Sequence, residues 1–235
     1  METIPARWYH DGRRGSVRLI VVHSTESSER PEGAEAVARY FATTDRKAST
    51  HRVSDNNSTV RCVDDADTAF GAAGANHDGL HLELCGKAGQ SAQEWTDAYS
   101  RAELEQAGST VREWSARWDV PLRWLTITQV ADGHSRGLCT HADVSKAFPD
   151  VSTGHWDPGP SFPKALALEI WTKETDMTPE QEATLVRIDE RLTRLERRVG
   201  TDNEGRDLSD ESDAQIRALR AIMENLGLDP ADVKL

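Results

Sequence analysis

Residues 141–163 concentrate histidines and aspartates, and this stretch ends close after an Asp-Pro-Gly-Pro sequence. His141, His155 and Asp157 all carry side chains that can bind a metal ion. A catalytic zinc ion usually takes three protein ligands and keeps a fourth position for water. The Pro-Gly pair that follows Asp157 breaks regular structure, so this carboxylate lies at a rigid turn. The stretch is a candidate metal site that needs a further ligand from elsewhere in the chain.

The best candidate for that ligand is His23, which follows the apolar run VRLIVV. A continuous, β-branched run of this kind is typical of a buried strand. A histidine at the carboxyl end of a core strand lies where an α/β sheet presents its chemistry. The alternatives are that His23 is a hydrogen-bonded core residue and that the Asp-Pro-Gly-Pro sequence is only a turn. The spacing alone leaves both interpretations open.

A second reactive group is expected on the strand LHLELCG, residues 80–86. Alternation along a strand puts the three leucines on one face and His81, Glu83 and Cys85 on the other. A carboxylate among apolar residues costs free energy unless it is paired or faces a cleft. Glu83 is therefore either an outward-facing residue of a half-solvated strand or a general base with a raised pKa.

Other segments are predicted to position these residues. Residues 33–43 and 92–118 have helical spacing of apolar side chains, and Pro163 to Trp171 resembles a short final helix. The runs 50–54 and 59–63 flank a DNNS turn, which predicts a β-hairpin. The small-residue loop GAAGANHDG that follows is too poor in large side chains to pack a core, so it is expected to line a site.

Composition excludes several classes of function. The chain has 235 residues and a formal net charge of −12, which argues against a nucleic-acid partner. It has no apolar run long enough for membrane insertion, and its first residues show no apolar segment typical of a secretory signal. Cys62, Cys85 and Cys139 have no ligand-like spacing, and we expect reduced thiols in a protein made in a cytoplasm.

The composition changes near residue 172, so we expect a domain over 1–172 and a separate appendage. Residues 173–200 carry a heptad pattern, 201–213 form an acidic linker, and 214–229 carry a second short helical pattern. The tail is predicted to be a helical hairpin, or alternatively a short coiled coil that makes the chain a homo-oligomer or docks a partner.

Several motifs in order make the first ~170 residues resemble the zinc-dependent N-acetylmuramoyl-L-alanine amidases, the amidase-2 and peptidoglycan-recognition-protein family. The version here is most similar to the amidase domain of endolysins from phages of actinobacteria. The resemblance implies an α/β fold with a mixed central β-sheet flanked by helices. The segments that carry it are VVHST, STHRVSDNNSTV, GANHDG, LHLELCG and THADVS with HWDPGPSFP.

The resemblance also implies roles for individual residues. His23, His141 and Asp157 match the zinc ligands, and Asp157 is replaced by cysteine in some members. Glu83 matches a glutamate that some members use as catalytic base. His155 matches a position that is often a lysine, which stabilises the oxyanion.

Three further residues are expected to contact substrate. His51 matches a histidine of the family's groove, and Asn76 lies in the small-residue loop. Thr25 follows His23 and could orient a bound group. The chain departs from the family at Thr50, where many members carry tyrosine, and at His155. These departures shift more of the chemistry to Glu83 and His155.

The implied function is hydrolysis, by zinc-activated water, of the amide bond between the lactyl group of N-acetylmuramic acid and L-Ala of the stem peptide. A phage endolysin would accumulate in the host cytoplasm without a signal peptide and reach the peptidoglycan after a separate holin opens the membrane. The alternatives are a non-catalytic peptidoglycan-binding module, a cytoplasmic amidase that recycles muropeptides, and a virion-associated structural protein. A zinc protease is disfavoured because HExxH is missing.

Overall fold

A computed structural model describes residues 1–152 and 154–173 of the chain. The heptad segment predicted for 173–200, apart from Lys173, lies outside these residues, and so do the linker of 201–213 and the helix of 214–229. No helix in the described part combines the length and apolarity needed to cross a membrane.

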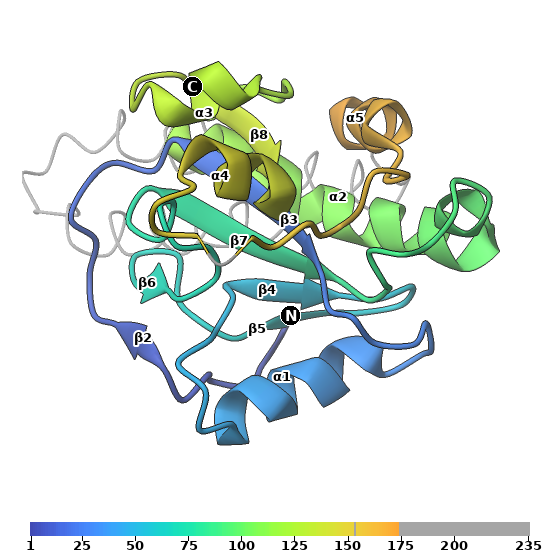
Figure 1. The fold of residues 1–235 in the computed structure, drawn as a ribbon. Coiled ribbons are helices and arrows are strands. Elements are labelled where there is room, and N and C mark those ends of the chain that lie inside the picture. The colour runs from blue at the N-terminus through green and yellow to red at the C-terminus, as the bar shows by residue number, and fades with distance from the viewer. Residues whose placement is uncertain (153, 174–235) are drawn as a thin grey trace, which may run out of the picture. The chain divides into compact units, whose positions relative to one another are not determined.

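A six-stranded mixed sheet forms the centre of the described residues, as predicted (Figure 1). Strand β3 runs parallel to both of its neighbours, β7 and β8, whereas β4 and β5 form the predicted antiparallel hairpin. The strands in spatial order are β1 (Glu2–Thr3), β5 (Thr59–Arg61), β4 (Arg52–Ser54), β7 (Gly79–Leu84), β3 (Leu19–Ser24) and β8 (Gly137–Thr140). A separate pair joins β2 (Tyr9–His10) to β6 (Thr68–Ala69).

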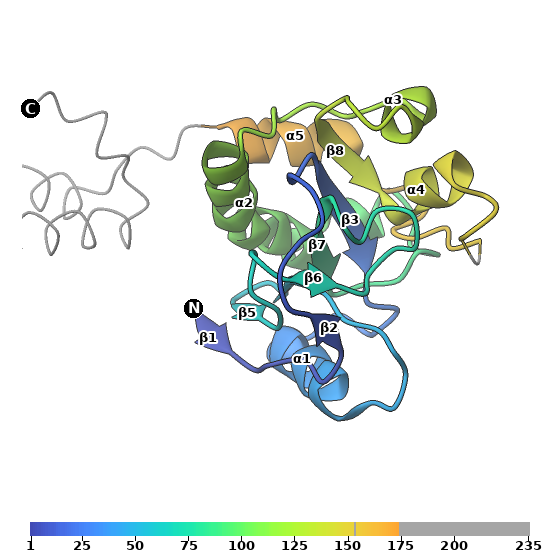
Figure 2. The same cartoon turned by 90° about the vertical axis from the view of Figure 1, so that its left-hand side faces the viewer.

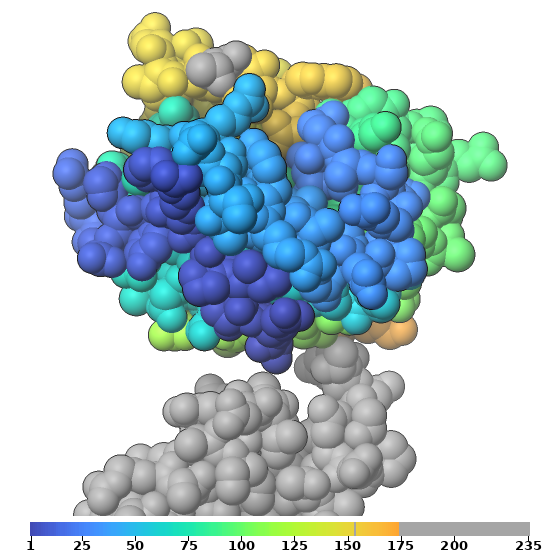
Figure 3. Space-filling view, turned by 90° about the horizontal axis from the view of Figure 1, so that it is seen from below, coloured from blue at the N-terminus to red at the C-terminus, as the bar shows by residue number. Residues whose placement is uncertain are grey.

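Helices cover both faces of this sheet. Figure 2 shows α2 (Ala98–Trp118) and α5 (Lys164–Thr172) on one side and α4 (His141–Ala147) on the other. The chain also forms α1 (Gly33–Thr43) and the short α3 (Ile127–Ala131). The N-terminal segment and α1 make up much of the face in Figure 3, where both are blue. The bounds of α1 are those that the sequence predicted.

Alternation along β3 and β7 decides which residues face each layer. Ile20 and Val22 pack with the three leucines of β7 in the core under α2 and α5. Leu19 and Val21 instead pack toward α3 and α4. His23 follows this second set by alternation, so the strand that fills the core also delivers a histidine to the α4 side.

The helix predicted over 92–118 is interrupted. Trp95 lies in a short 3₁₀ turn, η1 (Glu94–Thr96), and α2 begins only after Asp97, whose carboxylate accepts a hydrogen bond from the Ser100 amide at 2.9 Å. An aspartate in extended conformation that caps the following turn stops the helix from continuing backward. Trp95 and Trp114 are fully buried and belong to the core under α2 and α5.

Glu103 on α2 is a buried acid on the side of the sheet away from His23. It is fully buried, and its Oε1 accepts a hydrogen bond from the Cys85 amide at 2.5 Å. Burial raises the pKa of Glu103 well above its ordinary value. In the folded protein the carboxyl keeps its proton at pH values where the unfolded chain has released it.

We expect this group to make stability fall as pH rises. Above an unfolded pKa of about 4.5 the native state binds the extra proton, so the free energy of unfolding decreases until the folded pKa is passed. Glu103→Gln keeps a neutral side chain at every pH and should lose this dependence. Urea unfolding of both proteins at pH 5 and pH 8 tests it: the advantage of the variant should grow with pH, and parallel changes would contradict the assignment.

Candidate metal centre

Three side chains from distant parts of the chain meet in a small triangle. The Nδ1 atoms of His23 and His141 lie 3.1 Å apart. Oδ2 of Asp157 lies 3.2 Å from Nδ1 of His23, and Oδ1 of Asp157 lies 3.2 Å from Nδ1 of His141. Ligands at the usual 2.0–2.2 Å from a tetrahedral zinc ion are roughly 3.3–3.6 Å from one another. The triangle is therefore close to the size of one face of a zinc tetrahedron, and two imidazoles with one carboxylate suit that ion.

The sheet positions the two histidines. β3 and β8 pair in parallel, with Val22 opposite Thr140, so His23 and His141 each follow directly after one residue of this pair. The chain turns into α4 at His141, where the Thr140 hydroxyl caps the helix by accepting from the Asp143 amide, and the Asp143 carboxylate accepts from the Thr140 amide. This capping box fixes His141 in the first turn of the helix.

The loop between α4 and α5 supplies the third group. The Asp157 carbonyl accepts a hydrogen bond from the Ala142 amide at 3.0 Å, which ties the loop to the start of α4. Gly159 has φ +95° and passes so close to the Ala88 carbonyl that a Cβ there would lie 1.9 Å from its oxygen. Only glycine fits this contact, so the turn after Asp157 is pressed against the segment that follows β7.

Burial and hydrogen bonds shift the pKa values of Asp157 and His141. Burial alone would raise the pKa of Asp157, but the hydrogen bonds from His141 and His23 hold that pKa well below its usual range. Burial lowers the pKa of His141, which favours its neutral ring. An ionised carboxylate and a neutral imidazole are the forms that bind a metal ion. All three residues are buried, so an ion held here would be largely enclosed by protein.

Glu83 lies on β7 directly beside His23, its register partner on β3. Its Oε2 is enclosed and has no hydrogen-bond partner among the described residues. Burial raises the pKa of Glu83 well above its ordinary value, and the carboxylates of Asp157 and Glu26 raise it further. A carboxylate with a raised pKa next to a metal-ligand triangle has the character of a general base.

His155 borders the triangle from the solvent side. Its ring stacks on that of His141, with centroids 4.3 Å apart and planes 10° apart. Its Nδ1 lies 3.6 Å from an Asp157 oxygen, and its side chain is 55% exposed. Partial burial and the neighbouring His141 lower the pKa of His155. A neutral imidazole still donates one hydrogen bond, so His155 can reach a group bound beside the triangle.

The other expected site residues are more dispersed. Thr25 is half-buried, and its hydroxyl lies 2.7 Å from that of Ser27. Asn76 is half-buried, and its side-chain oxygen accepts from the Ala72 amide, so it closes its own loop. His51 is fully buried. The structure does not bring His51 to the surface, where a substrate would meet it.

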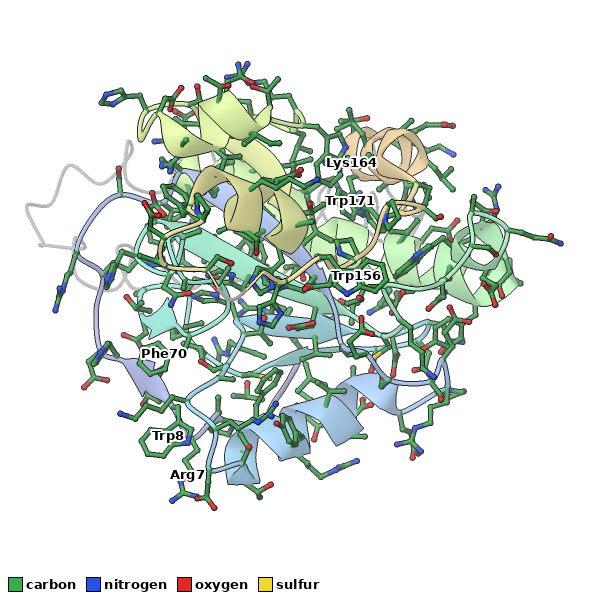
Figure 4. All side chains as sticks on the ribbon, viewed as in Figure 1. Arg7, Trp8, Phe70, Trp156, Lys164 and Trp171 are labelled. Atoms are coloured by element: carbon green, nitrogen blue, oxygen red, sulfur yellow. The ribbon has the colours of Figure 1, made fainter. Side chains whose placement is uncertain are left out.

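Two residues near the triangle went unassigned in the sequence. His81 shares the face of β7 with Glu83, and its Nδ1 lies 3.1 Å from Nε2 of His23. The alternation that places Glu83 opposite the leucines of β7 places His81 on the same face, so the sequence pattern could have identified His81 as a site residue. Trp156 is 56% exposed between His155 and Asp157, where it lies on the loop before α5 (Figure 4). Exposure of a large aromatic residue cannot be read from its own sequence.

A cavity of about 580 Å³ lies beside His155, whereas none of the three triangle residues lines it. It lies between α4, the loop that carries Asp157 and the start of α5. The residues that matter most for its chemistry are Thr140, Asp143, Lys146, His155, Trp156 and Lys164. Lys164 is paired with Asp143 at 2.7 Å, whereas Lys146 is exposed to solvent. The cavity thus offers an aromatic surface and a cation beside His155, whose ring stacks on that of His141.

Comparisons with known proteins agree with this fold. The fold is similar to that of the Staphylococcus aureus hydrolase AmiA, solved in complex with its ligand, with a TM-score of 0.55 and 17% identity over 72% of this chain and 82% of that one. It is also similar to an AmpD derivative, with a TM-score of 0.51 and 18% identity over 73% and 94% of the two chains. No curated protein sequence matches the chain. The model of the Amidase_2 family, described as N-acetylmuramoyl-L-alanine amidase, matches residues 13–160, and the chain belongs to this family.

Proposed function

We propose that the chain is a zinc-dependent N-acetylmuramoyl-L-alanine amidase. It hydrolyses the amide bond between the lactyl group of N-acetylmuramic acid and L-Ala of the stem peptide in bacterial peptidoglycan. The observation that carries the proposal is the triangle of His23, His141 and Asp157 with the enclosed carboxylate of Glu83 on the adjacent strand. Family membership supports the same class of reaction.

Each group has a chemical task in this reaction. A bound zinc ion would supply Lewis-acid activation of water and of the scissile carbonyl. Glu83 accepts the proton of the attacking water and returns it to the L-Ala nitrogen as the amide bond breaks. His155 donates a hydrogen bond to the oxygen on which negative charge develops, a contact whose loss costs roughly 3–4 kcal/mol. Burial of Glu83 keeps its proton affinity high enough for the first of these transfers.

The biological setting that fits best is lysis of an actinobacterial host by a phage endolysin. In that setting a separate holin gives the enzyme access to the wall, and the residues after 173 bind a partner or a second copy of the chain. The motifs quoted for the resemblance support this setting. The alternatives are recycling of soluble muropeptides in a cytoplasm and binding of peptidoglycan without cleavage.

The direct test is digestion of purified meso-diaminopimelate-type peptidoglycan with and without a chelator. Mass spectrometry should find stem peptides that begin with L-Ala, lost on chelation and restored by Zn²⁺. Binding of peptidoglycan without cleavage would instead indicate a recognition module that is not an enzyme. Cleavage of soluble muropeptides but not of intact sacculi would favour recycling.

We expect Trp156 to contribute binding of substrate rather than chemistry. The residue lines the cavity next to His155 and is largely exposed, so its truncation leaves the core unchanged. Trp156→Ala should raise KM on a soluble muropeptide roughly five- to tenfold, with little change in kcat, because an aromatic contact contributes about 1 kcal/mol. Tyr40→Ala, which removes an exposed aromatic side chain on α1, is the control. Equal KM values for both variants would exclude the cavity as a substrate site.

A further inference from the structure

His81 is a buried histidine that the mechanism above does not use. Its side chain is fully buried, and its Nδ1 lies 3.1 Å from Nε2 of His23. The other nitrogen of His23, Nδ1, faces His141 and Asp157. His23 therefore stands between the candidate metal centre on one side and His81 on the other, and each ring nitrogen has a separate partner.

The chemistry of a metal ligand fixes the direction of the His23–His81 hydrogen bond. If His23 binds a metal through the lone pair of Nδ1, its proton must reside on Nε2. That N–H then donates, and Nδ1 of His81 accepts. The same hydrogen bond holds the His23 ring in the plane that aims Nδ1 at the triangle.

The surroundings of His81 fix its backbone by hydrogen bonds and pack against its ring, whose Nε2 has no hydrogen-bond partner among the described residues. Its backbone amide donates to Nδ1 of His51 at 3.0 Å, and the two rings are stacked with planes 10° apart. The Thr50 hydroxyl donates to the His81 carbonyl at 2.8 Å. This arrangement gives His51 and Thr50, both fully buried, a supporting position behind His81.

Gly71 provides the space that the ring of His81 occupies. A Cβ atom at this position would lie 2.5 Å from Cγ and Nδ1 of His81. Side-chain atoms do not approach so closely, so any larger residue at 71 would displace the imidazole. Glycine at position 71 thus leaves space for the His81 ring in the orientation in which its Nδ1 faces Nε2 of His23.

We propose that His81 is a positioning residue for the metal centre, which accepts the Nε2 hydrogen bond of His23 and so fixes the tautomer and ring orientation that leave Nδ1 free for zinc. This inference rests on the proposed zinc site. It assigns His81 no contact with substrate. The competing explanation is that His81 only fills space between the rings of His23 and His51.

Two substitutions at His81 separate these explanations. His81→Leu fills much of the same volume but offers no acceptor. His81→Asn is smaller, but its side-chain oxygen can lie near the position of Nδ1 and accept the same hydrogen bond. The measurement is zinc affinity, from competition with a chromophoric chelator at fixed pH, with circular dichroism of the metal-free proteins as a control for folding.

If His81 positions His23, His81→Leu should bind zinc about 10- to 100-fold more weakly than the wild type, and His81→Asn should recover most of the loss. Gly71→Ala, which leaves the histidine in place but displaces its ring, should weaken zinc binding in the same direction. His134→Leu, at an exposed histidine on the loop after α3, should have no effect.

Two outcomes would overturn the inference: equal affinity for zinc in His81→Leu and the wild type, or weaker binding by Asn than by Leu, as space filling requires. Absence of zinc binding by the wild-type protein is a different result. It would remove the proposed zinc site itself, so the two failures are distinguishable.

Discussion

Glu83→Gln should reduce release of stem peptides by roughly 10²- to 10⁴-fold while the protein keeps its zinc. Glutamine has nearly the shape of glutamate but cannot take a proton from water. Glu83 is the register partner of His23, and its enclosed carboxylate has a raised pKa because of burial and the nearby Asp157. The experiment measures turnover by mass spectrometry and zinc content by elemental analysis on the same preparation.

Glu103→Gln is the matched control for this variant. Glu103 is also a buried glutamate with a raised pKa, but it lies on α2 and bonds the Cys85 amide. The same chemical change there should leave turnover within about twofold, since no reacting group is lost. Retained turnover in Glu83→Gln would assign the base to another group, and loss of zinc would make Glu83 part of the metal centre.

Removing the charge of Asp157 should have an equally large effect, through the metal. Asp157 is the one carboxylate of the triangle, and hydrogen bonds from His141 and His23 lower its pKa, which favours the ionised form. Asp157→Asn keeps the size of the side chain and loses the charge. We expect zinc affinity to fall by more than about 100-fold, with turnover lost at limiting zinc.

Asp157→Cys tests whether the defect is one of ligand chemistry. A thiolate is a zinc ligand with a bond of about 2.3 Å, so cysteine should restore much of the affinity that asparagine loses. Chelator competition ranks the three proteins, and circular dichroism shows whether the loop substitution disturbs the fold. Wild-type affinity in Asp157→Asn would mean that zinc binds elsewhere.

Part of this candidate site was predictable because His23 and Glu83 lie on strands with strong local signals. The β-branched run before His23 indicates β3, and alternation in LHLELCG assigns Glu83 to the face opposite the three leucines. The hairpin of β4 and β5 and the bounds of α1 also follow from local pattern. In each case one face of a single element, repeated over several residues, carries the information.

Features that depend on contacts between distant segments were not predictable. β8 has four residues, too few for a periodic signal, and only its pairing with β3 identifies it as a strand that places His141. The same limit applies to His51, a polar residue in a hairpin that the assembled sheet buries completely.

The three cysteines, expected to be reduced thiols, are free and buried.

The break in the helix over 92–118 has a different cause. Apolar residues recur at helical spacing through the whole segment, and this pattern hides the stop at Asp97. A capping carboxylate acts on a few backbone groups, so it leaves no trace in the periodicity of the apolar side chains. Local hydrogen bonding here overrides the longer pattern.

Because Glu83 and His23 lie opposite each other in the parallel register of β3 and β7, enzymatic activity depends on correct pairing of these two strands. A shift of one residue between these strands would send Glu83 to the opposite face, where the leucines now pack. A shift of two would keep it on the correct face but one pleat away from His23. In recombinant preparations, specific activity should therefore be proportional to the fraction of molecules that have the native register. This should hold even for preparations whose average secondary-structure content is normal.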